Sequence, residues 1–334
     1  MKKFVYIIAA SILLIGCKKE RQFFPKDIEQ IEIEIVRFDN DIMNVSESSI
    51  KEDVNLLYSE YPDFMPRFVE DILGIPSEDT AYLEEQLPKF LNDTTYGFHA
   101  TNLLEKEKFT NISDIQKELN FAFSRIHYLF PELPLPTLYF FISGFNSSIM
   151  FVDDDIAIGT DMYLGSDYEL YNMVVYDYQK QTMRKECIPA DVVSAYLFKN
   201  IPYTSHQNRL LDQMIYRGKI IYLLSLILPD EPDYEIMGYT KEQWQWCTKY
   251  EKDIWNLVMD KKDLFKTESI VLTSYMNDGP FTSEISQESP ARLGTWLGWR
   301  IAKSYMNHNE QVSLQEFMKD GDSQKILEQS YYRP

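Results

Sequence analysis

The pattern of apolar and polar positions begins with an unbroken run of apolar or small residues, from 4 to 15, directly after Lys2 and Lys3. Crossing a bilayer takes roughly 20 apolar residues, so this run is too short to be a transmembrane helix. A positive start, a short apolar segment and a small residue before a cleavage point are typical of an export signal. The pattern therefore predicts a signal peptide ahead of the folded domain.

The run ends in Leu14-Ile15-Gly16-Cys17, the arrangement of a lipobox. Small Gly16 lets the lipoprotein signal peptidase approach, and the thiol of Cys17 can receive a diacylglyceryl group. We therefore predict a signal peptide at residues 1–16, cleavage after Gly16 and lipidation of Cys17. The alternative is an ordinary signal peptide with a cysteine there by chance. Because an anchor of more than one acyl chain holds stably, we expect a membrane-attached chain with a polar tether over residues 17–27.

Apolar residues at every second position, and clusters of β-branched and aromatic residues, predict the strands. Isoleucine alternates with glutamate within residues 28–38, and residues 137–142 read TLYFFI. Both patterns are typical of strands. Two shorter strands, at 150–152 and 156–159, flank Asp153-Asp154-Asp155. These acids form either a hairpin turn or a calcium site. We favour the turn, because a calcium loop needs alternating oxygen ligands, a glycine and a terminal glutamate.

Helical patterns occupy most of the remaining chain, and prolines separate several of them. We expect breaks at Pro62, Pro66, Pro76 and Pro88, with Ser113 and Ser289 as helix caps and Pro290 in a first turn. The expected helices are 49–61, 67–73, 78–91, 113–129, 190–199, 208–228, 241–259 and 290–306. Without regular alternation of strand and helix, the order predicts an α+β fold, mostly helical with a small sheet. We expect one domain over residues 28–334.

Composition supports a globular domain and narrows its partners. The chain has 334 residues, 45% of them apolar, which is enough for a sizeable core. Without residues 1–16 it carries 31 basic and 52 acidic residues, a net charge of −21. So acidic a domain does not attract nucleic acid or anionic lipid head groups. The lipid, rather than charge, must hold the protein at a membrane.

The motifs of common enzymes are absent from the sequence. It contains no H-E-x-x-H, no G-x-S-x-G and no P-loop, and no two of its four histidines have ligand spacing. We therefore predict no catalytic residues, no metal site and no cofactor. Cys187 and Cys247 remain after Cys17. The exported compartment permits a disulfide, but whether these two cysteines are bridged stays open.

Two glycine-containing helical segments stand out as a candidate partner or cleft surface. In residues 208–228 the apolar face includes Gly218, whose cost of roughly 1 kcal/mol relative to alanine should be offset by close approach of another backbone. In residues 290–306, Leu293, Leu297, Ile301 and Tyr305 form a core stripe beside Gly294 and Gly298. The groove serves either helix packing or a partner. The candidate surface residues are Arg217, Gly218, Arg292, Gly294, Gly298 and Arg300.

Several blocks together resemble the GldB family of gliding-motility lipoproteins of Bacteroidetes. They are the lipobox, YPDFMPRFVEDILGI at 61–75, GTDMYLG at 159–165, LLDQMIYRGKIIY at 210–222 and PFTSEISQESPARLGTWLGWRIAKSYM at 280–306. The resemblance covers most of the chain after the signal. It implies an envelope lipoprotein of the gliding machinery, which in this phylum is linked to type IX secretion, with other envelope proteins as partners.

The family looks distantly similar to zincin-type peptidases, which implies a degenerate, pseudo-peptidase architecture. The zincin H-E-x-x-H helix would lie near residues 189–199, where this chain has Pro189-Ala190-Asp191-Val192-Val193-Ser194-Ala195. The later glutamate ligand of zincins would fall in a helix like 210–222, which offers Tyr216 and Arg217 instead. A permanently charged arginine cannot bind zinc. The resemblance thus implies a zincin-like body without its metal site.

The leading hypothesis is a non-catalytic accessory or assembly factor of the gliding machinery, lipid-anchored in the cell envelope. Lipoproteins of this phylum that are exported to the cell surface often carry an acidic tract after the lipidated cysteine. No such tract follows Cys17, which favours a periplasm-facing position. The first alternative is an envelope hydrolase or metallopeptidase with an unusual site. The second is a lipoprotein that binds a small ligand.

Overall fold

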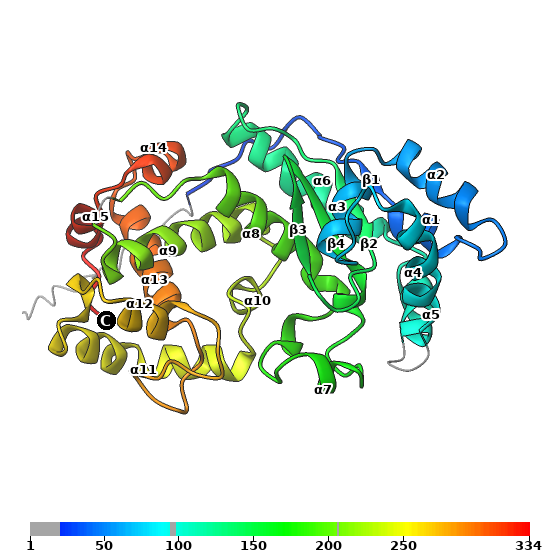
Figure 1. Cartoon of the computed structure of the whole chain (residues 1–334). Coiled ribbons are helices and arrows are strands. Elements are labelled where there is room, and N and C mark those ends of the chain that lie inside the picture. The colour runs from blue at the N-terminus through cyan, green and yellow to red at the C-terminus, as the bar shows by residue number, and fades with distance from the viewer. Residues whose placement is uncertain (1–20, 94–97, 206) are drawn as a thin grey trace, which may run out of the picture.

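The computed structural model describes residues 21–93, 98–205 and 207–334, and it shows a mostly helical chain around one small sheet (Figure 1). The fold is α+β, as the order of predicted elements indicated. The predicted signal peptide, Gly16 and Cys17 lie outside the described residues.

The sheet has the strand order β1-β2-β4-β3. Strands β1, β2 and β4 are parallel, and β3 pairs antiparallel with β4 at the edge. The turn between β3 and β4 contains Asp153, which has a positive φ of 50°, so the hairpin turn predicted at the three aspartates is confirmed. The strands are β1 (Ile35–Val36), β2 (Leu138–Phe141), β3 (Ile149–Val152) and β4 (Asp155–Gly159).

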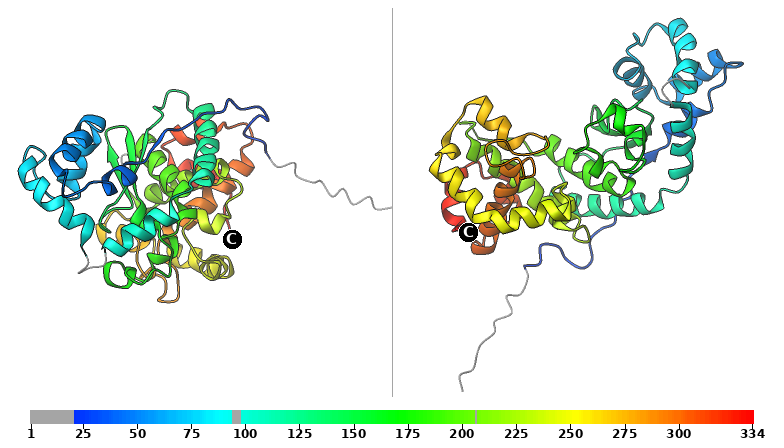
Figure 2. Two further views of the ribbon diagram at one scale, coloured as in Figure 1. Left: turned by 90° about the vertical axis from the view of Figure 1, so that its right-hand side faces the viewer. Right: turned by 90° about the horizontal axis from the view of Figure 1, so that it is seen from below.

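Helices surround the sheet and extend beyond it at both ends of the molecule (Figures 1 and 2). No helix in the described part of the chain is both long and apolar enough to cross a membrane. The α-helices are α1 (Phe38–Met43), α2 (Ile50–Glu60), α3 (Phe64–Asp71), α4 (Thr80–Asn92), α5 (Phe98–Lys108), α6 (Ser113–Leu129), α7 (Tyr171–Val174), α8 (Ile188–Asn200), α9 (Leu210–Ile227), α10 (Asp233–Ile236), α11 (Lys241–Asp260), α12 (Ser269–Met276), α13 (Leu293–His308), α14 (Leu314–Lys319) and α15 (Ser323–Ser330). Short 3₁₀ helices are η1 (Thr160–Tyr163), η2 (Lys180–Thr182), η3 (Lys185–Cys187) and η4 (Asp263–Phe265).

Alternation along the strands divides the buried residues into two cores. On β2, Leu138 and Phe140 face the larger core, which includes residues of α6, α8, α9 and α13. Phe141 faces the smaller core, which residues of α1 to α4 complete. Since successive side chains of a strand point to opposite faces, a short apolar strand can hold two helical layers together.

The segment predicted as a strand at residues 28–38 is mostly extended chain, and only two residues of it join the sheet. The amide of Ile31 donates to Ser124 Oγ at 2.8 Å, and the amide of Ile33 donates to Asn120 Oδ1 at 2.9 Å. Side chains of α6 therefore take the place of a neighbouring strand. The isoleucine pattern indicated the burial correctly but not the hydrogen-bond partner.

Several details of the predicted helices were wrong. Ser113 is the first residue of α6 rather than its cap, and Pro290 lies before α13 rather than in its first turn. Pro66 and Pro88 lie inside α3 and α4 rather than ending a helix. Pro66 is in the first turn, where its missing N–H removes no helical bond. Ser289 caps no helix, because its hydroxyl donates to Ser286 O at 2.7 Å and α13 begins only at Leu293.

Part of the expected tether lies on the folded body. The Arg21 guanidinium donates to the Val312 carbonyl and lies over the ring of Phe23. Phe23 in turn contacts the edge of Tyr222 on α9. The described chain is thus packed against α9 and the segment before α14 from its first residue, and the polar tether is shorter than residues 17–27.

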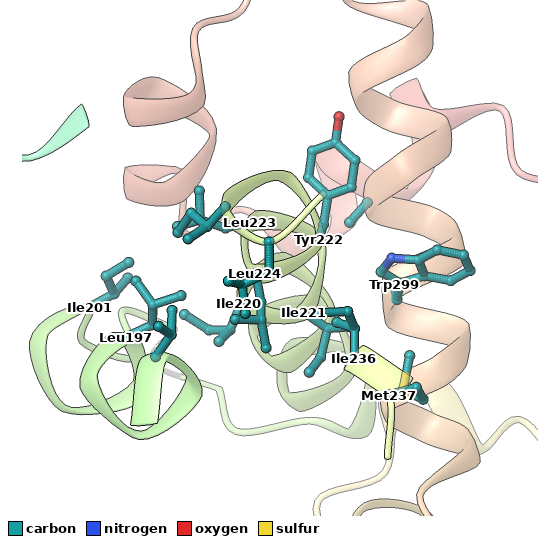
Figure 3. Packing of buried hydrophobic residues seen from close by; sticks show 14 of the residues in the cluster. Leu197, Ile201, Ile220, Ile221, Tyr222, Leu223, Leu224, Ile236, Met237 and Trp299 are labelled. Atoms are coloured by element: carbon teal, nitrogen blue, oxygen red, sulfur yellow. The ribbon is translucent and has the colours of Figure 1, made fainter. Parts of the chain in front are cut away.

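Helices α9 and α13 pack backbone to backbone, and they form the most extensive helix pair of the fold. A Cβ atom on Gly218 would lie 2.1 Å from the carbonyl carbon of Gly298, and one on Gly298 would lie 1.8 Å from Met214 O. Neither position has room for a methyl group. The close approach expected at Gly218 is confirmed, with Gly298 as its counterpart. Figure 3 shows the neighbouring side chains, with Leu197 and Ile201 on one side of α9 and Trp299 on α13.

A buried carboxyl pair connects α5 to α1. Glu105 on α5 and Asp39 on α1 have no exposed surface, and Asp39 also forms an ion pair with Arg37. Burial, together with the negative charge of Asp39, raises the pKa of Glu105 to about 8. Glu105 therefore holds its proton to a higher pH than an exposed glutamate does.

Replacing Gly298 with alanine should lower the free energy of unfolding by at least about 2 kcal/mol, because the methyl group meets backbone atoms that cannot rotate away. Urea unfolding of the variant measures this change. Gly279→Ala is the matched control, since its Cβ would find its nearest atom at 3.8 Å. Equal stability of Gly298→Ala and the wild type would disprove the backbone contact.

Glu105→Gln should flatten the dependence of stability on pH. A carboxyl group whose folded pKa is raised binds more protons in the folded state, so its contribution is lost as pH rises from about 4.5 to about 8. Above pH 8 the variant should be more stable than the wild type by about 1–3 kcal/mol. Urea unfolding between pH 4.5 and 9 tests this, with the exposed Glu107→Gln on the same helix as control. Parallel curves for wild type and Glu105→Gln would contradict it.

Candidate functional site

A cavity of about 460 Å³ lies between the sheet edge and the C-terminal helices. Its walls come from α8, α9, α10, the chain from 175 to 187, the loop at 278–279, and Ala291, Arg292 and Thr295 at the start of α13. Ser148 and Ile149, at the start of edge strand β3, also line it. A volume of this size is within the range of sites for small molecules or short peptides.

One face of α8 forms the wall nearest the sheet. The helix begins with Pro189 in its first turn, where a proline is tolerated, and it packs against β3 and β4. The residues that it turns to the cavity follow the spacing of a single helical face. They are Ala190, Asp191, Ser194, Ala195 and Phe198.

Asp191 is the acidic group of this wall. It accepts a hydrogen bond of 2.9 Å from the Tyr163 hydroxyl, which η1 presents directly after β4. Burial raises the pKa of Asp191 to about 6, against the opposing effects of the Tyr163 hydrogen bond and of the positive charge on Arg292. Asp191 can therefore gain or lose a proton close to neutral pH.

Two arginines bring positive charge to the opposite side of the cavity. Arg217 projects from α9 and donates from Nη1 to Met276 O at 2.7 Å. Arg292 precedes α13 and pairs through Nε with Asp278 at 2.8 Å. Burial, and then the charge of Arg292, lower the pKa of Arg217. The two guanidinium groups are thus close enough to repel each other.

A further ion pair closes one rim. Arg184 Nη2 pairs with Glu235 of α10, and both side chains are partly exposed. Gln181 also reaches this region by donating to Gly238 O at 2.7 Å. These contacts tie the segment containing η2 and η3 to α10 across the mouth of the cavity.

The six residues predicted as one partner or cleft surface separate into three groups. Arg217 and Arg292 line the cavity together. Gly218 and Gly298 form the contact between α9 and α13, and a Cβ on Gly294 would meet Met276 Sδ at 2.4 Å. Arg300 lies elsewhere, paired with Glu251 at 2.7 Å. The groove beside the three glycines is therefore filled by other residues of the chain. Of the six predicted residues, only Arg217 and Arg292 line the cavity.

Asp191 and Tyr163 were not singled out by the sequence. Tyr163 lies in one of the blocks that carry the family resemblance, and Asp191 lies in the segment compared with the zincin helix, but nothing in their local spacing indicates that they meet. Their contact joins residues 28 positions apart. The signal available was only that an aspartate occurs in the first turn of a helix that is otherwise apolar.

The cavity offers neither an activated thiol nor a metal cluster in the described ranges. Burial raises the pKa of the Cys187 thiol to about 12, so it stays protonated at neutral pH. Cys187 and Cys247 are both free cysteines, which settles the disulfide left open by the sequence. Among the described residues, no group of three or more His, Cys, Asp or Glu side chains is placed to hold a metal ion.

Comparison with known proteins gives one finding over most of the chain. The model of the family described as gliding motility protein GldB matches residues 21–334. No curated protein and no solved structure matches the chain.

The carboxyl carbon of Asp191 should titrate with a midpoint near pH 6 when followed by carbon NMR. Arg292→Gln should move this midpoint upward, because the variant loses the positive charge that stabilises the ionised carboxylate. Lys303→Gln on α13 is the control, since Lys303 pairs with Asp233 and does not line the cavity. A midpoint near pH 4 in the wild type would show that Asp191 is more solvated than its surroundings indicate.

Proposed function

The chain belongs to the gliding motility protein GldB family, and on this premise we propose that it is a lipid-anchored, non-catalytic accessory or assembly factor of the gliding machinery, linked to type IX secretion. The observation that carries the proposal is the family match over residues 21–334. The protein faces the periplasm and acts by binding other envelope proteins.

The packing of residues 21–24 supports an anchor that holds the body close to the bilayer. Arg21 and Phe23 contact the body, and Phe24 contacts Tyr128 and the guanidinium of Arg125. Only residues 18–20 separate them from Cys17. Four steps of extended chain reach at most roughly 14 Å. Acylation of Cys17 therefore places the α9 and α14 end of the molecule next to the membrane surface.

The charge of the cavity supports binding rather than metal-dependent hydrolysis. In the two segments that the resemblance compares with the metal-binding helices of zincins, the residues that line the cavity include Ala190 and Ser194 of α8 and Arg217 of α9. Arg217 and Arg292 place two permanent positive charges in the cavity, and arginine does not ligate metal ions. The same charges attract an anionic group of a partner.

Deleting the gene should abolish colony spreading and type IX secretion, and only an acylatable chain should restore them. Complementation with Cys17→Ala should fail, because the body then lacks its anchor. Spreading assays and analysis of secreted proteins measure the two phenotypes. The matched control carries a cleavable signal without a lipobox, which exports the same body unanchored and separates failed anchoring from failed export.

Two outcomes would contradict the proposal. Normal spreading and normal secretion in the deletion strain would remove the role in the gliding machinery. Stoichiometric zinc in the purified protein would instead favour the alternative of a metallopeptidase with an unusual site.

A further inference from the structure

The cavity contains a cation that the protein itself leaves largely uncompensated. Arg217 is partly buried, yet within the described residues it forms no ion pair, and its guanidinium donates to the carbonyl of Met276. Its side chain lines the cavity. Burying a charge without a counter-charge is costly, and the neighbouring Arg292 increases that cost. Such an arrangement is typical of a site that an anion completes.

Arg292 is held in place before any ligand arrives. Its backbone has a left-handed φ of 56°, which costs a residue other than glycine roughly 1–2 kcal/mol. The guanidinium donates from Nη2 to Met237 O at 2.8 Å and pairs with Asp278. Gly238 leaves room for it, since a Cβ there would lie 2.8 Å from Nη2. Strain that the surroundings maintain is often found at binding sites.

Two carboxylates act on this pair of arginines: Asp278 pairs with Arg292 and also attracts Arg217, and Asp191 attracts Arg292 from the α8 wall. Asp278 is 68% exposed, so water already screens part of its attraction for Arg292. Guanidinium groups match the planar geometry of a carboxylate and bind it through paired hydrogen bonds. The planar donor geometry of the two guanidinium groups therefore suits a carboxylate.

The remaining walls fit a peptide better than a small free acid. Ile221, Leu224 and Ile236 provide apolar surface next to the arginines. Ser148 and Ile149 line the same cavity at edge strand β3, whose outer side has no neighbouring strand among the described residues. Extended peptides commonly add to such an edge through backbone hydrogen bonds.

We propose that this cavity binds the carboxyl terminus of a peptide, with its carboxylate on Arg217 and Arg292, its last side chain against Ile221 and Ile236, and its chain leaving along β3. Asp191, on the α8 wall, is an acceptor available to a backbone N–H of the peptide. This role rests on the proposed accessory function, because it identifies the part of an envelope partner that the protein would hold.

The test is a binding measurement on the acylated full chain in detergent micelles. The probes are pools of N-acetylated tripeptides with every amino acid at the last position, prepared once as free acids and once as carboxamides. The free-acid pool should raise the melting temperature, as ligands of the folded state do. It should also shift the Nε–H resonances of Arg217 and Arg292. The carboxamides should bind at least about tenfold more weakly, because they lack the charge that pairs with the arginines.

Variants locate the site. Arg217→Gln should weaken binding of the free acids by at least about tenfold. Arg217→Lys should retain part of it, since a point charge replaces the planar fork. The matched control is Arg300→Gln on α13, which lies outside the cavity and should change the affinity by less than about twofold. The Arg217 and Arg292 resonances of the wild-type protein give a test that does not depend on any variant folding.

Three results would overturn the proposal. They are no binding by either pool, equal binding of acids and carboxamides, and binding by acetate alone as tight as by the peptides, which would indicate a site for small anions. None of these depends on motility, so a failed binding test and a normal deletion strain are separate outcomes.

Discussion

The contact between Gly218 on α9 and Gly298 on α13 is the constraint on which the C-terminal half of the molecule depends. Because neither glycine has room for a Cβ, the two backbones pack directly against each other. Arg217 precedes the first glycine, and Arg292 lies just ahead of the helix that carries the second. The close packing of α9 against α13 therefore determines how close Arg217 and Arg292 come to each other. A shift of α13 would change the binding geometry as well as the packing of the core.

The sheet provides the other half of the cavity through a few residues at its edge. Tyr163 follows β4 directly, and its hydroxyl holds Asp191 in the first turn of α8. The N-terminal end of a helix favours a negative charge, but burial is the larger effect here and raises the pKa of Asp191 to about 6. The Asp191 carboxyl, whose charge changes near pH 6, thus lines the same cavity as the permanently charged Arg217 and Arg292. Neither helix pair nor sheet alone would create this combination.

How far the sequence predicts the structure depends on whether a feature is local. Strands β2 to β4, α6, α9 and α11 follow from periodicity and from turn residues, and the demand for a close neighbour at Gly218 was visible in its cost to the helix. The start of α13 was not predictable from the sequence, since it depends on Arg292 adopting a left-handed backbone that Met237 and Asp278 stabilise. The cavity was not predictable either. It joins side chains from several distant segments, and one sequence carries no signal for such proximity.

The acidity of the protein bears directly on how a carboxylate could bind. A net charge of −21 after the signal peptide repels anions at long range. At physiological ionic strength that repulsion is screened beyond about 8 Å, so the groups in contact decide the affinity. Inside the cavity those groups include Arg217 and Arg292, and the same lining holds apolar side chains, such as Ile221 and Ile236, together with the carboxyl groups of Asp191 and Asp278. A free anion would gain only the ion pair, whereas a peptide would also bury a side chain and add backbone hydrogen bonds at β3. The same surroundings that weaken small anions thus favour an anion that is part of a chain.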